Sequence, residues 1–408
     1  MPADLDALAE RVLRQNWREG VRRDGTPYGY TCPAPGRYKH QWHWDSCFSA
    51  IACARVDPAR AREELRTVLR GGRADGFLPH TAFWGARAGW RRAPLYATDR
   101  VLGDLRTATI GPPLLAFAWE RVALASPDDP AFAGEAVAAL AAHHDWLERE
   151  RDPDHDGLIS ILLPDESGLD DSPKYDAVYG RFAHYKPGYV VMVERCRRLR
   201  WDSRAILARY DEQVEDVLVN VANALSLRAL GRLSCDPTWT LRAQRVEAAL
   251  LDRCLDDRTG LFLDLAGRDE RPVRVSTWSS LAPLALGDAV PEAIRRRLIE
   301  EHLLHPRRYA AACGIPSMSM DEPTFRSGWD GFRTWRGASW INTAWLLVPA
   351  LDELGYHDAG ERIVASLVAA ARRCGLREYY DARTGVGYGA RDFAWSALIA
   401  DLARDRIA

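Results

Sequence analysis

Asp57-Pro-Ala-Arg-Ala-Arg-Glu-Glu-Leu-Arg-Thr-Val-Leu-Arg-Gly-Gly72 carries the signals of a complete helix in one stretch. Asp57 is a good N-cap, and Pro58 suits the first helical position because no intrahelical hydrogen bond needs its missing N–H. Apolar residues then recur at intervals of three and four and form one stripe. Gly71-Gly72 ends the pattern. The segment therefore predicts an amphipathic helix with one buried face.

The same periodicity recurs along most of the chain, whereas the alternation typical of strands is almost absent. We therefore predict an all-α fold of about a dozen helices or slightly more. Besides the stretch above, the segments with helical periodicity are 41–55, 112–125, 131–150, 185–200, 203–232, 237–255, 277–286, 291–303, 338–354, 358–373 and 391–404.

Asp-rich turns follow helical segments at Asp152–Gly157, Asp257–Gly260 and Asp381–Gly385. Their spacing of roughly one hundred residues is too loose for a formal repeat. It indicates helical hairpins stacked in a ring, with comparable loops at one end. Two long irregular segments, 18–40 and 72–108, are rich in Gly, Pro and aromatic residues. We expect them to cover a pocket as lids.

Composition excludes several classes of protein. The 408 residues are 47% hydrophobic with a net charge of −2, which argues against nucleic acid or an anionic membrane as partner. No membrane-length apolar run and no signal peptide are visible. The eight cysteines form no CxxC pair, which disfavours a zinc site and a disulfide framework. No Pro/Ser-rich linker interrupts the chain, so we expect one cytoplasmic domain over 1–408, without metal or cofactor; homo-oligomerisation stays open.

Two acidic loops far apart in the sequence are the first candidates for chemistry. Glu166-Ser-Gly-Leu-Asp-Asp-Ser-Pro173 places three carboxylates in six residues, with further aspartates beside it. Like charges would help one carboxyl to hold the proton that a general acid needs. The second loop, Glu378-Tyr-Tyr-Asp381, could hold the ionised base. Taken alone, the first loop is equally a helix-capping segment, and the second is more often a surface turn.

Two segments rich in tryptophan suggest a sugar-binding wall. Tyr38-Lys-His-Gln-Trp-His-Trp-Asp45 places Trp42 and Asp45 three residues apart, on one face if the segment is helical. An aromatic ring packs on sugar C–H groups, while a carboxylate accepts hydroxyls. The segment 332–345 gathers tryptophan, arginine and asparagine at the expected start of a helix. Ordinary core packing explains either segment nearly as well.

Three other sequence features are not assigned to the candidate site. Asp152-Pro-Asp-His-Asp-Gly157 resembles the start of a calcium loop, but Leu163 stands at the twelfth position where an EF-hand has glutamate. Gly385-Val-Gly-Tyr-Gly389 lacks the strand and helix of a dinucleotide-binding turn. The pair His143-His144 falls within a helical segment, and we expect it to be partly exposed.

Taken together and in this order, the four segments resemble the bacterial branch of glycoside hydrolase family 63. This branch is related to the trehalases of family 37 and includes mannosylglycerate and glucosylglycerate hydrolases. The resemblance covers about 38–398. It implies an (α/α)6 barrel, six helical hairpins in a toroid, with lid loops over the pocket. It also implies an inverting α-glycosidase acting on a small α-glucoside or α-mannoside, either a glycerate conjugate or a short disaccharide.

The resemblance also implies roles for individual residues. Asp170 matches the general acid and Glu378 the general base, while Asp45 matches an acceptor for substrate hydroxyls. An inverting pair of carboxyl groups stands roughly 6.5–9.5 Å apart. A glycerate carboxylate would need a cation, for which three arginines are candidates: Arg204, Arg228 and Arg333. The remaining expected substrate-binding residues are Tyr38, Gln41, Trp42, Trp44, His80, Trp84, Gly168, Trp335, Arg336, Gly337, Trp340 and Tyr380.

The chain departs from the family pattern at two places. Asp171 stands where the family usually has asparagine, and Gly111 stands where it often has glutamine. Both changes leave the identity of the sugar open. A sugar epimerase on the same barrel, with histidines as acid and base, is one alternative. A non-catalytic carbohydrate-binding protein is another. The histidines that could serve as acid and base in an epimerase are His40, His43, His80 and His184.

Overall fold

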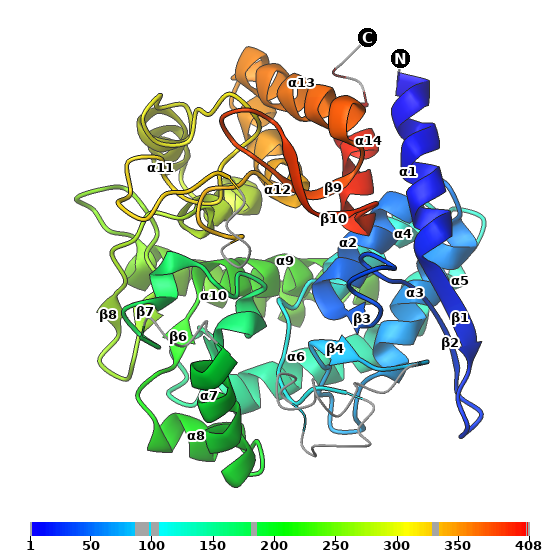
Figure 1. Cartoon of the computed structure of the whole chain (residues 1–408). Coiled ribbons are helices and arrows are strands. Elements are labelled where there is room, and N and C mark those ends of the chain that lie inside the picture. Colours follow the sequence, from blue (N-terminus) through cyan, green and yellow to red (C-terminus); the bar gives the residue numbers. More distant parts are fainter. Residues whose placement is uncertain are drawn as a thin grey trace.

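The chain folds as an (α/α)6 barrel, as the family resemblance predicts (Figure 1). The computed structural model describes residues 2–85, 98, 106–180, 186–328, 334–404 and 406. Six helical elements pack in an inner ring, each on the next and the last against the first. In ring order they are α2 (His43–Cys53), α4 (Leu115–Leu124), α9 (Val217–Ser234), the 3-10 segment η5 (Trp278–Ala289), α12 (Ile341–Glu353) and α14 (Leu398–Ala403).

An outer layer of amphipathic helices covers this ring. The stretch 57–72 forms one of them, with the Asp57 side chain accepting a hydrogen bond from the Arg60 N–H as the predicted N-cap. Leu65 and Val68 of that helix are buried against the inner ring. The outer helices are α1 (Pro2–Asn16), α3 (Pro58–Arg70), α6 (Val137–Arg151), α10 (Pro237–Ala249), α11 (Glu292–Arg297) and α13 (His357–Cys374).

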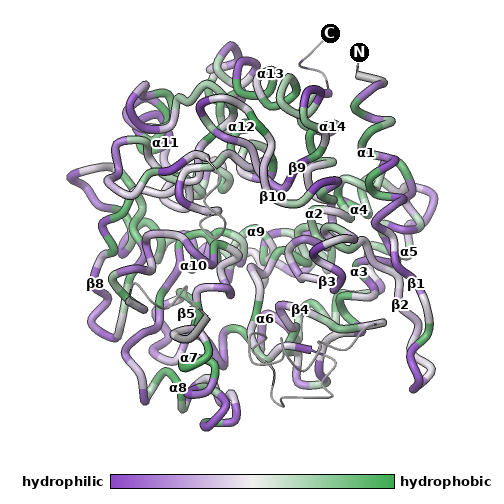
Figure 2. The backbone as a smooth tube through the Cα atoms, in the orientation of Figure 1, coloured by the Kyte–Doolittle hydropathy of each residue, from purple (hydrophilic) through white to green (hydrophobic). Residues whose placement is uncertain are grey.

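The inner ring is the hydrophobic core of the molecule. Most residues of α9 are buried, and α12 is buried along nearly its whole length. Figure 2 shows apolar residues gathered in interior helices such as α12, and polar residues on outlying turns. None of the helices within the described ranges has both the length and the apolar character needed to cross a bilayer.

Shorter elements connect the ring. Several are strands of two residues, too short to show an alternating pattern in the sequence. The helices are α5 (Ala131–Glu135), α7 (Lys186–Arg198) and α8 (Ser203–Arg209), with 3-10 turns η2 (Pro164–Ser167), η3 (Pro173–Tyr175) and η7 (Ala394–Ala397) and π-helical turns η4 (Leu250–Cys254) and η6 (Leu298–Leu303). The strands are β1 (Trp17–Val21), β2 (Pro27–Thr31), β3 (Gln41–Trp42), β4 (Thr81–Ala82), β5 (Ser160–Ile161), β6 (Val214–Glu215), β7 (Leu265–Ala266), β8 (Arg271–Pro272), β9 (Arg377–Tyr380) and β10 (Gly387–Arg391).

These strands pair antiparallel in small sheets. The strands β5, β6, β7 and β8 form one four-stranded sheet in that order, which brings Ser160 opposite Glu215. The hairpin of β9 and β10 holds the segment that contains Glu378. Strand β3, which pairs with β4, leads directly into α2. The sheets therefore serve to place loops around the barrel mouth.

Three expectations about local structure are wrong. The segment 203–232 is not one helix, because Asp216 acts as an N-cap and accepts from the Val219 N–H, which starts α9 after a break. Trp42 does not share a helical face with Asp45, since it ends β3 as the N-cap residue of α2. The pair His143-His144 is buried rather than partly exposed, because it faces α9 and the interior.

Candidate active site

A pocket of about 120 Å³ lies where four of the predicted segments converge. Glu378 and Asp170 both line it, together with Asp45. Residues from segments more than three hundred positions apart in the chain thus meet at one end of the barrel. The other lining residues are Pro33, Tyr38, Trp42, Trp44, His80, Gly168, Thr334, Trp335, Trp340, Phe393 and Trp395.

Glu378 is held in place by a network of hydrogen bonds. It lies in β9 and is 5% exposed. The Tyr38 hydroxyl donates to its Oε1 at 2.9 Å, and the Ala390 N–H donates to its Oε2 at 2.6 Å. An Arg37 nitrogen stands 3.8 Å from Oε2. Burial raises the pKa of Glu378, while these donors and the arginine act in the opposite direction.

The glycine-rich stretch after Glu378 has a structural purpose. It forms β10, which pairs with β9. Gly389 has φ +67°, and a Cβ there would lie 2.5 Å from Oε2 of Glu378. Only glycine therefore allows the strand to pass this close to the carboxylate.

Asp170 is presented by a tight turn over an aromatic ring. The 3-10 turn η2 ends at Gly168, which has φ +73° and lies against Trp44. A Cβ at Gly168 would stand 2.4 Å from that ring, so the turn requires glycine. Asp170 follows two residues later and is exposed at the pocket, where a substrate can reach it.

The acidic neighbours of Asp170 do not form the cluster of free like charges that the sequence suggested. Glu166 is fully buried, and both its oxygens accept from Arg151, at 2.6 and 2.8 Å. Asp176 makes a two-bonded ion pair with Arg336. The expectation of free like charges is wrong for Glu166 and Asp176, because each carboxylate pairs with an arginine and so anchors the loop.

Asp171 connects the acidic loop to the tryptophan-rich segment. Its Oδ1 accepts from the Trp335 N–H at 3.0 Å and from the Thr334 hydroxyl at 3.3 Å. Asp171 is 7% exposed and does not line the pocket. The extra carboxylate at this position therefore fixes the pocket wall from behind.

Asp45 and His80 form the floor on the other side. Asp45 lies in the first turn of α2, and burial raises its pKa to about 7, with the nearby charges of Glu378 and Asp170 acting in the same direction. His80 stands 3.5 Å from Asp165, and the pKa of its imidazole is raised by that carboxylate against the effect of burial. With such a pKa, the Asp45 carboxyl is partly protonated and partly ionised near neutral pH. It can therefore donate a hydrogen bond to a sugar hydroxyl or accept one from it.

Aromatic rings form the remaining wall. Trp335 and Trp340 stack with ring centroids 3.9 Å apart and planes 7° apart. Trp395 packs edge-on against Trp44 at 5.1 Å. Trp395 and Phe393 were not predicted from the sequence to line the pocket. The available signal was this pair of aromatic residues in the segment 391–404, which was predicted only to be helical.

Five predicted binding residues stand behind the pocket and outside its lining. Gln41 accepts a hydrogen bond from the Trp84 ring N–H at 2.6 Å, and both are buried. Gly337 donates through its N–H to Ser317, and the Tyr380 hydroxyl donates to the Gly375 carbonyl. With Arg336, which pairs with Asp176, they support the residues that line the pocket.

Two of the three arginines proposed for a carboxylate are placed away from this pocket. Arg204 is exposed in the first turn of α8. Arg228 lies on α9 and is paired with Glu247 while donating to the Leu286 carbonyl. Both arginines lie away from the pocket because the parts of α8 and α9 that carry them face other neighbours. Arg333 lies outside the described residues, as does His184.

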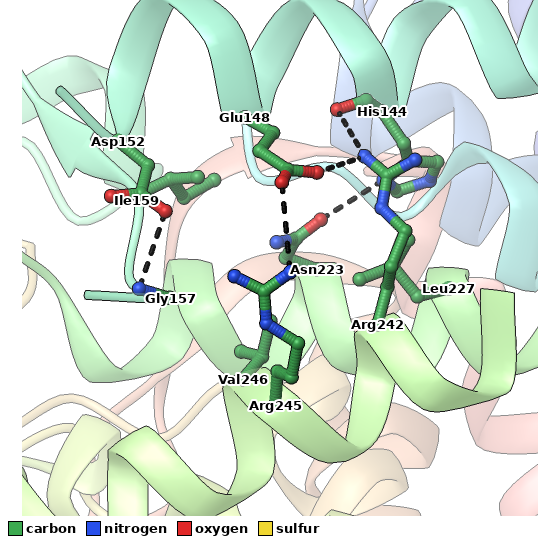
Figure 3. A pocket seen from close by; sticks show the side chains of 10 residues that line it. All are labelled: His144, Glu148, Asp152, Gly157, Ile159, Asn223, Leu227, Arg242, Arg245 and Val246. Atoms are coloured by element: carbon green, nitrogen blue, oxygen red, sulfur yellow. Dashed lines mark hydrogen bonds and ion pairs between the residues drawn. The ribbon is translucent and has the colours of Figure 1, made fainter. Parts of the chain in front are cut away.

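The other hollows do not compete with this site. Figure 3 shows the one between α6, α9 and α10, where Glu148 pairs with Arg242 and Arg245 and His144 contacts Asn223. It encloses about 30 Å³, against about 120 Å³ for the candidate active site. A larger hollow of about 420 Å³ lies near Thr259 and Ser276, with no paired carboxyls placed across aromatic rings.

The histidines give little support to the epimerase alternative. His80 is the histidine among the lining residues of the described pocket. His43 is buried, and burial lowers its pKa to about 3, so it stays neutral. His40 packs edge-on against Phe83. A second histidine facing His80 across the sugar is not found in the described part of the pocket.

Comparison with known proteins identifies close relatives. The family model described as a mannosylglycerate hydrolase MGH1-like glycoside hydrolase domain matches residues 38–396. The chain is 31% identical to a mannosylglycerate hydrolase of Rubrobacter radiotolerans, over 97% of this chain and 96% of the relative. It is 26% identical to a glucosylglycerate hydrolase of Mycolicibacterium hassiacum, over 97% and 96% of the two chains.

Solved structures agree. A family 63 mannosylglycerate hydrolase from Thermus thermophilus, in complex with Tris and D-glycerate, superposes with a TM-score of 0.84 at 28% identity, covering 98% of this chain and 99% of that one. The neutral trehalase Nth1 of Saccharomyces cerevisiae superposes with a TM-score of 0.62 at 16% identity, covering 98% and 80%. The second match supports the barrel fold alone.

Proposed function

Because the chain belongs to the mannosylglycerate hydrolase MGH1-like glycoside hydrolases of family 63, we propose that it hydrolyses an α-glycoside of glycerate with inversion at the anomeric carbon. The single observation that supports this most strongly is the meeting of Asp170 and Glu378 in one aromatic-walled pocket. Both mannosylglycerate and glucosylglycerate hydrolases are among its relatives, which supports mannose or glucose as the proposed sugar.

In the proposed mechanism, Asp170 protonates the glycosidic oxygen while Glu378 removes a proton from the attacking water on the opposite face. The Tyr38 hydroxyl, which donates to Glu378, keeps that carboxylate oriented and favours its ionised form. Asp45 accepts hydroxyls of the sugar ring, and the stacked Trp335 and Trp340 pack against its C–H groups. One step thus gives the hexose and free glycerate.

The carboxylate of glycerate needs a cation near the leaving-group side. We propose Arg333 for this role, since it directly precedes Thr334 of the pocket lining. An arginine can bind a carboxylate through two parallel hydrogen bonds. Arg204 and Arg228 do not suit this role, because they lie away from the described lining of the pocket.

The experiment is steady-state hydrolysis of mannosylglycerate, glucosylglycerate and trehalose. We expect Asp170→Asn and Glu378→Gln each to lower kcat by about 10³-fold or more, with unchanged circular dichroism. Glu361→Gln, which removes an exposed carboxylate of α13, is the matched control and should act like the parent protein. In the same assay Arg333→Ala should raise KM for the glycerate conjugates.

Three outcomes would contradict the proposal. Near-normal hydrolysis by Asp170→Asn or Glu378→Gln would remove the assigned pair. Binding of a glycerate conjugate without any turnover by the parent protein would instead identify a carbohydrate-binding protein. Conversion of one hexose into another would indicate an epimerase.

A further inference from the structure

Four carboxylates from three separate segments meet on the outer side of the barrel. Asp154 and Asp156 come from the Asp-rich turn after α6, Glu215 from β6, and Glu270 from the turn between β7 and β8. One oxygen of each lies within 4.8 Å of the corresponding oxygen of every other. Carboxylates packed this closely repel one another unless a cation lies between them.

Glu215 shows that the cluster is more than a solvated acidic surface. This residue is 6% exposed, and its Oε2 is buried without a hydrogen-bond partner among the described residues. A buried carboxylate oxygen in this state carries the full cost of desolvation. A ligand that supplies positive charge would remove that cost.

The loop itself presents two of its three aspartates to the cluster. Asp152 is occupied within the turn, because its oxygens accept from the Asp156 N–H at 3.1 Å and from the Gly157 N–H at 3.2 Å. Figure 3 shows the contact between Asp152 and Gly157. The side chains of Asp154 and Asp156 remain to face Glu215 and Glu270. The turn therefore contributes Asp154 and Asp156 to the cluster, whereas Asp152 stabilises the turn itself.

One protein cation already contacts the cluster. The Arg253 Nε stands 2.9 Å from Asp156, and its guanidinium also pairs with Glu270. A single guanidinium cannot balance four carboxylates, and it contacts two of them. Arg253 is 29% exposed, so it can move aside or stay as an outer partner.

We propose that Asp154, Asp156, Glu215 and Glu270 bind a calcium ion. All four donors are carboxylate oxygens, the ligands that hard cations prefer, and no histidine or cysteine is part of the cluster that would favour zinc. Calcium accepts irregular sets of six to eight oxygens, which suits a site assembled from a turn and a sheet, with water completing the shell. Glu215 and Glu270 take the place of the missing twelfth-position glutamate of the sequence motif.

The ion would join the α6–β5 turn to β6 and to the β7–β8 turn. Strand β5 pairs with β6 and leads directly into η2 and the Asp170 loop. Calcium at this position would stabilise the support of that loop without touching substrate. The expected effect is therefore on stability, with kcat little changed.

The test is titration of the chelator-treated full chain with CaCl2 by calorimetry and thermal unfolding. We expect one calcium ion per chain, binding in the micromolar to millimolar range, and a Tm increase of about 2 °C or more. Glu215→Gln and Asp156→Asn should each weaken binding by about tenfold or more, since each removes a charged ligand. Arg253→Met should bind calcium more tightly, because a competing charge is gone.

Asp269→Asn is the matched control. It removes one negative charge from the same β7–β8 turn, at a side chain 83% exposed and outside the four-carboxylate cluster. It should bind calcium like the parent chain. Absence of both heat and Tm shift in the parent chain up to about 5 mM CaCl2 would overturn the proposal. Unchanged affinity in both Glu215→Gln and Asp156→Asn would do the same.

Discussion

The carboxylates of the pocket owe their different chemistry to their neighbours. Glu378 is buried but receives hydrogen bonds from Tyr38 and Ala390, which favour its ionised form. Asp45 is also buried, and burial raises its pKa to about 7 although His80 acts in the opposite direction. Asp170 is the exposed member, which a leaving group can reach. In the proposed mechanism, carboxyl groups therefore act as base, hydroxyl acceptor or acid according to their burial and partners.

Substitution of Arg37 tests whether a neighbouring charge controls the ionisation of Glu378. A base must be ionised, so activity should rise as pH increases through the pKa of Glu378. Burial raises that pKa and Arg37 lowers it. Removing the arginine in Arg37→Ala should move the acidic limb of kcat/KM to higher pH. Because Arg37 is 51% exposed, the expected shift is only a few tenths of a pH unit.

The measurement is the pH profile of kcat/KM from about pH 4 to 8, which reports groups of the free enzyme. Arg204→Ala, an exposed arginine away from the pocket, should leave the profile in place. An acidic limb displaced to lower pH in Arg37→Ala would show that another group controls it.

At the level of elements, the hairpin of β9 and β10 acts as the holder of Glu378. Its second strand holds most of the glycine-rich stretch, and an irregularity in the pairing between Tyr388 and Arg391 brings the Ala390 N–H to the carboxylate. This explains why a glycine repeat that could be mistaken for a nucleotide loop belongs to a glycosidase site.

Gly389→Ala should therefore damage catalysis more than folding. The new Cβ would lie 2.5 Å from Oε2 of Glu378, so the carboxylate must move. A displacement near 1 Å costs about 10²-fold in rate, which is the expected loss in kcat. Gly134→Ala, where a Cβ meets nothing within 4 Å, is the control. A well-folded Gly389→Ala variant with the parent kcat would disprove this role of the hairpin.

At the level of the whole molecule, most of the barrel was predictable from helical periodicity and the family resemblance. The α3 segment shows why: cap, stripe and stop signals are all local. The break before α9 was not predicted from periodicity, because the strand β6 has only two residues and shows no alternation, and the start of α9 is marked by a single capping aspartate, Asp216.

The pocket, like the barrel, has parts that the sequence predicted and parts that it did not. Glu378, Asp170, Asp45 and the tryptophans lie in segments with recognisable composition, and the structure brings them together. The partners of the acidic loop depend on long-range contacts: Arg151 for Glu166 and Arg336 for Asp176. The carboxylate cluster around Glu215 likewise joins three segments, and the sequence motif alone contains only part of it.

The most direct test of the central claim is the anomeric configuration of the first product. Proton NMR during the first minutes of hydrolysis of an α-linked glycerate glycoside would record it before mutarotation. Single displacement by Asp170 and Glu378 predicts the β-anomer of the hexose as the initial product. An initial α-anomer would contradict the account, because it requires a covalent intermediate and a different role for the base.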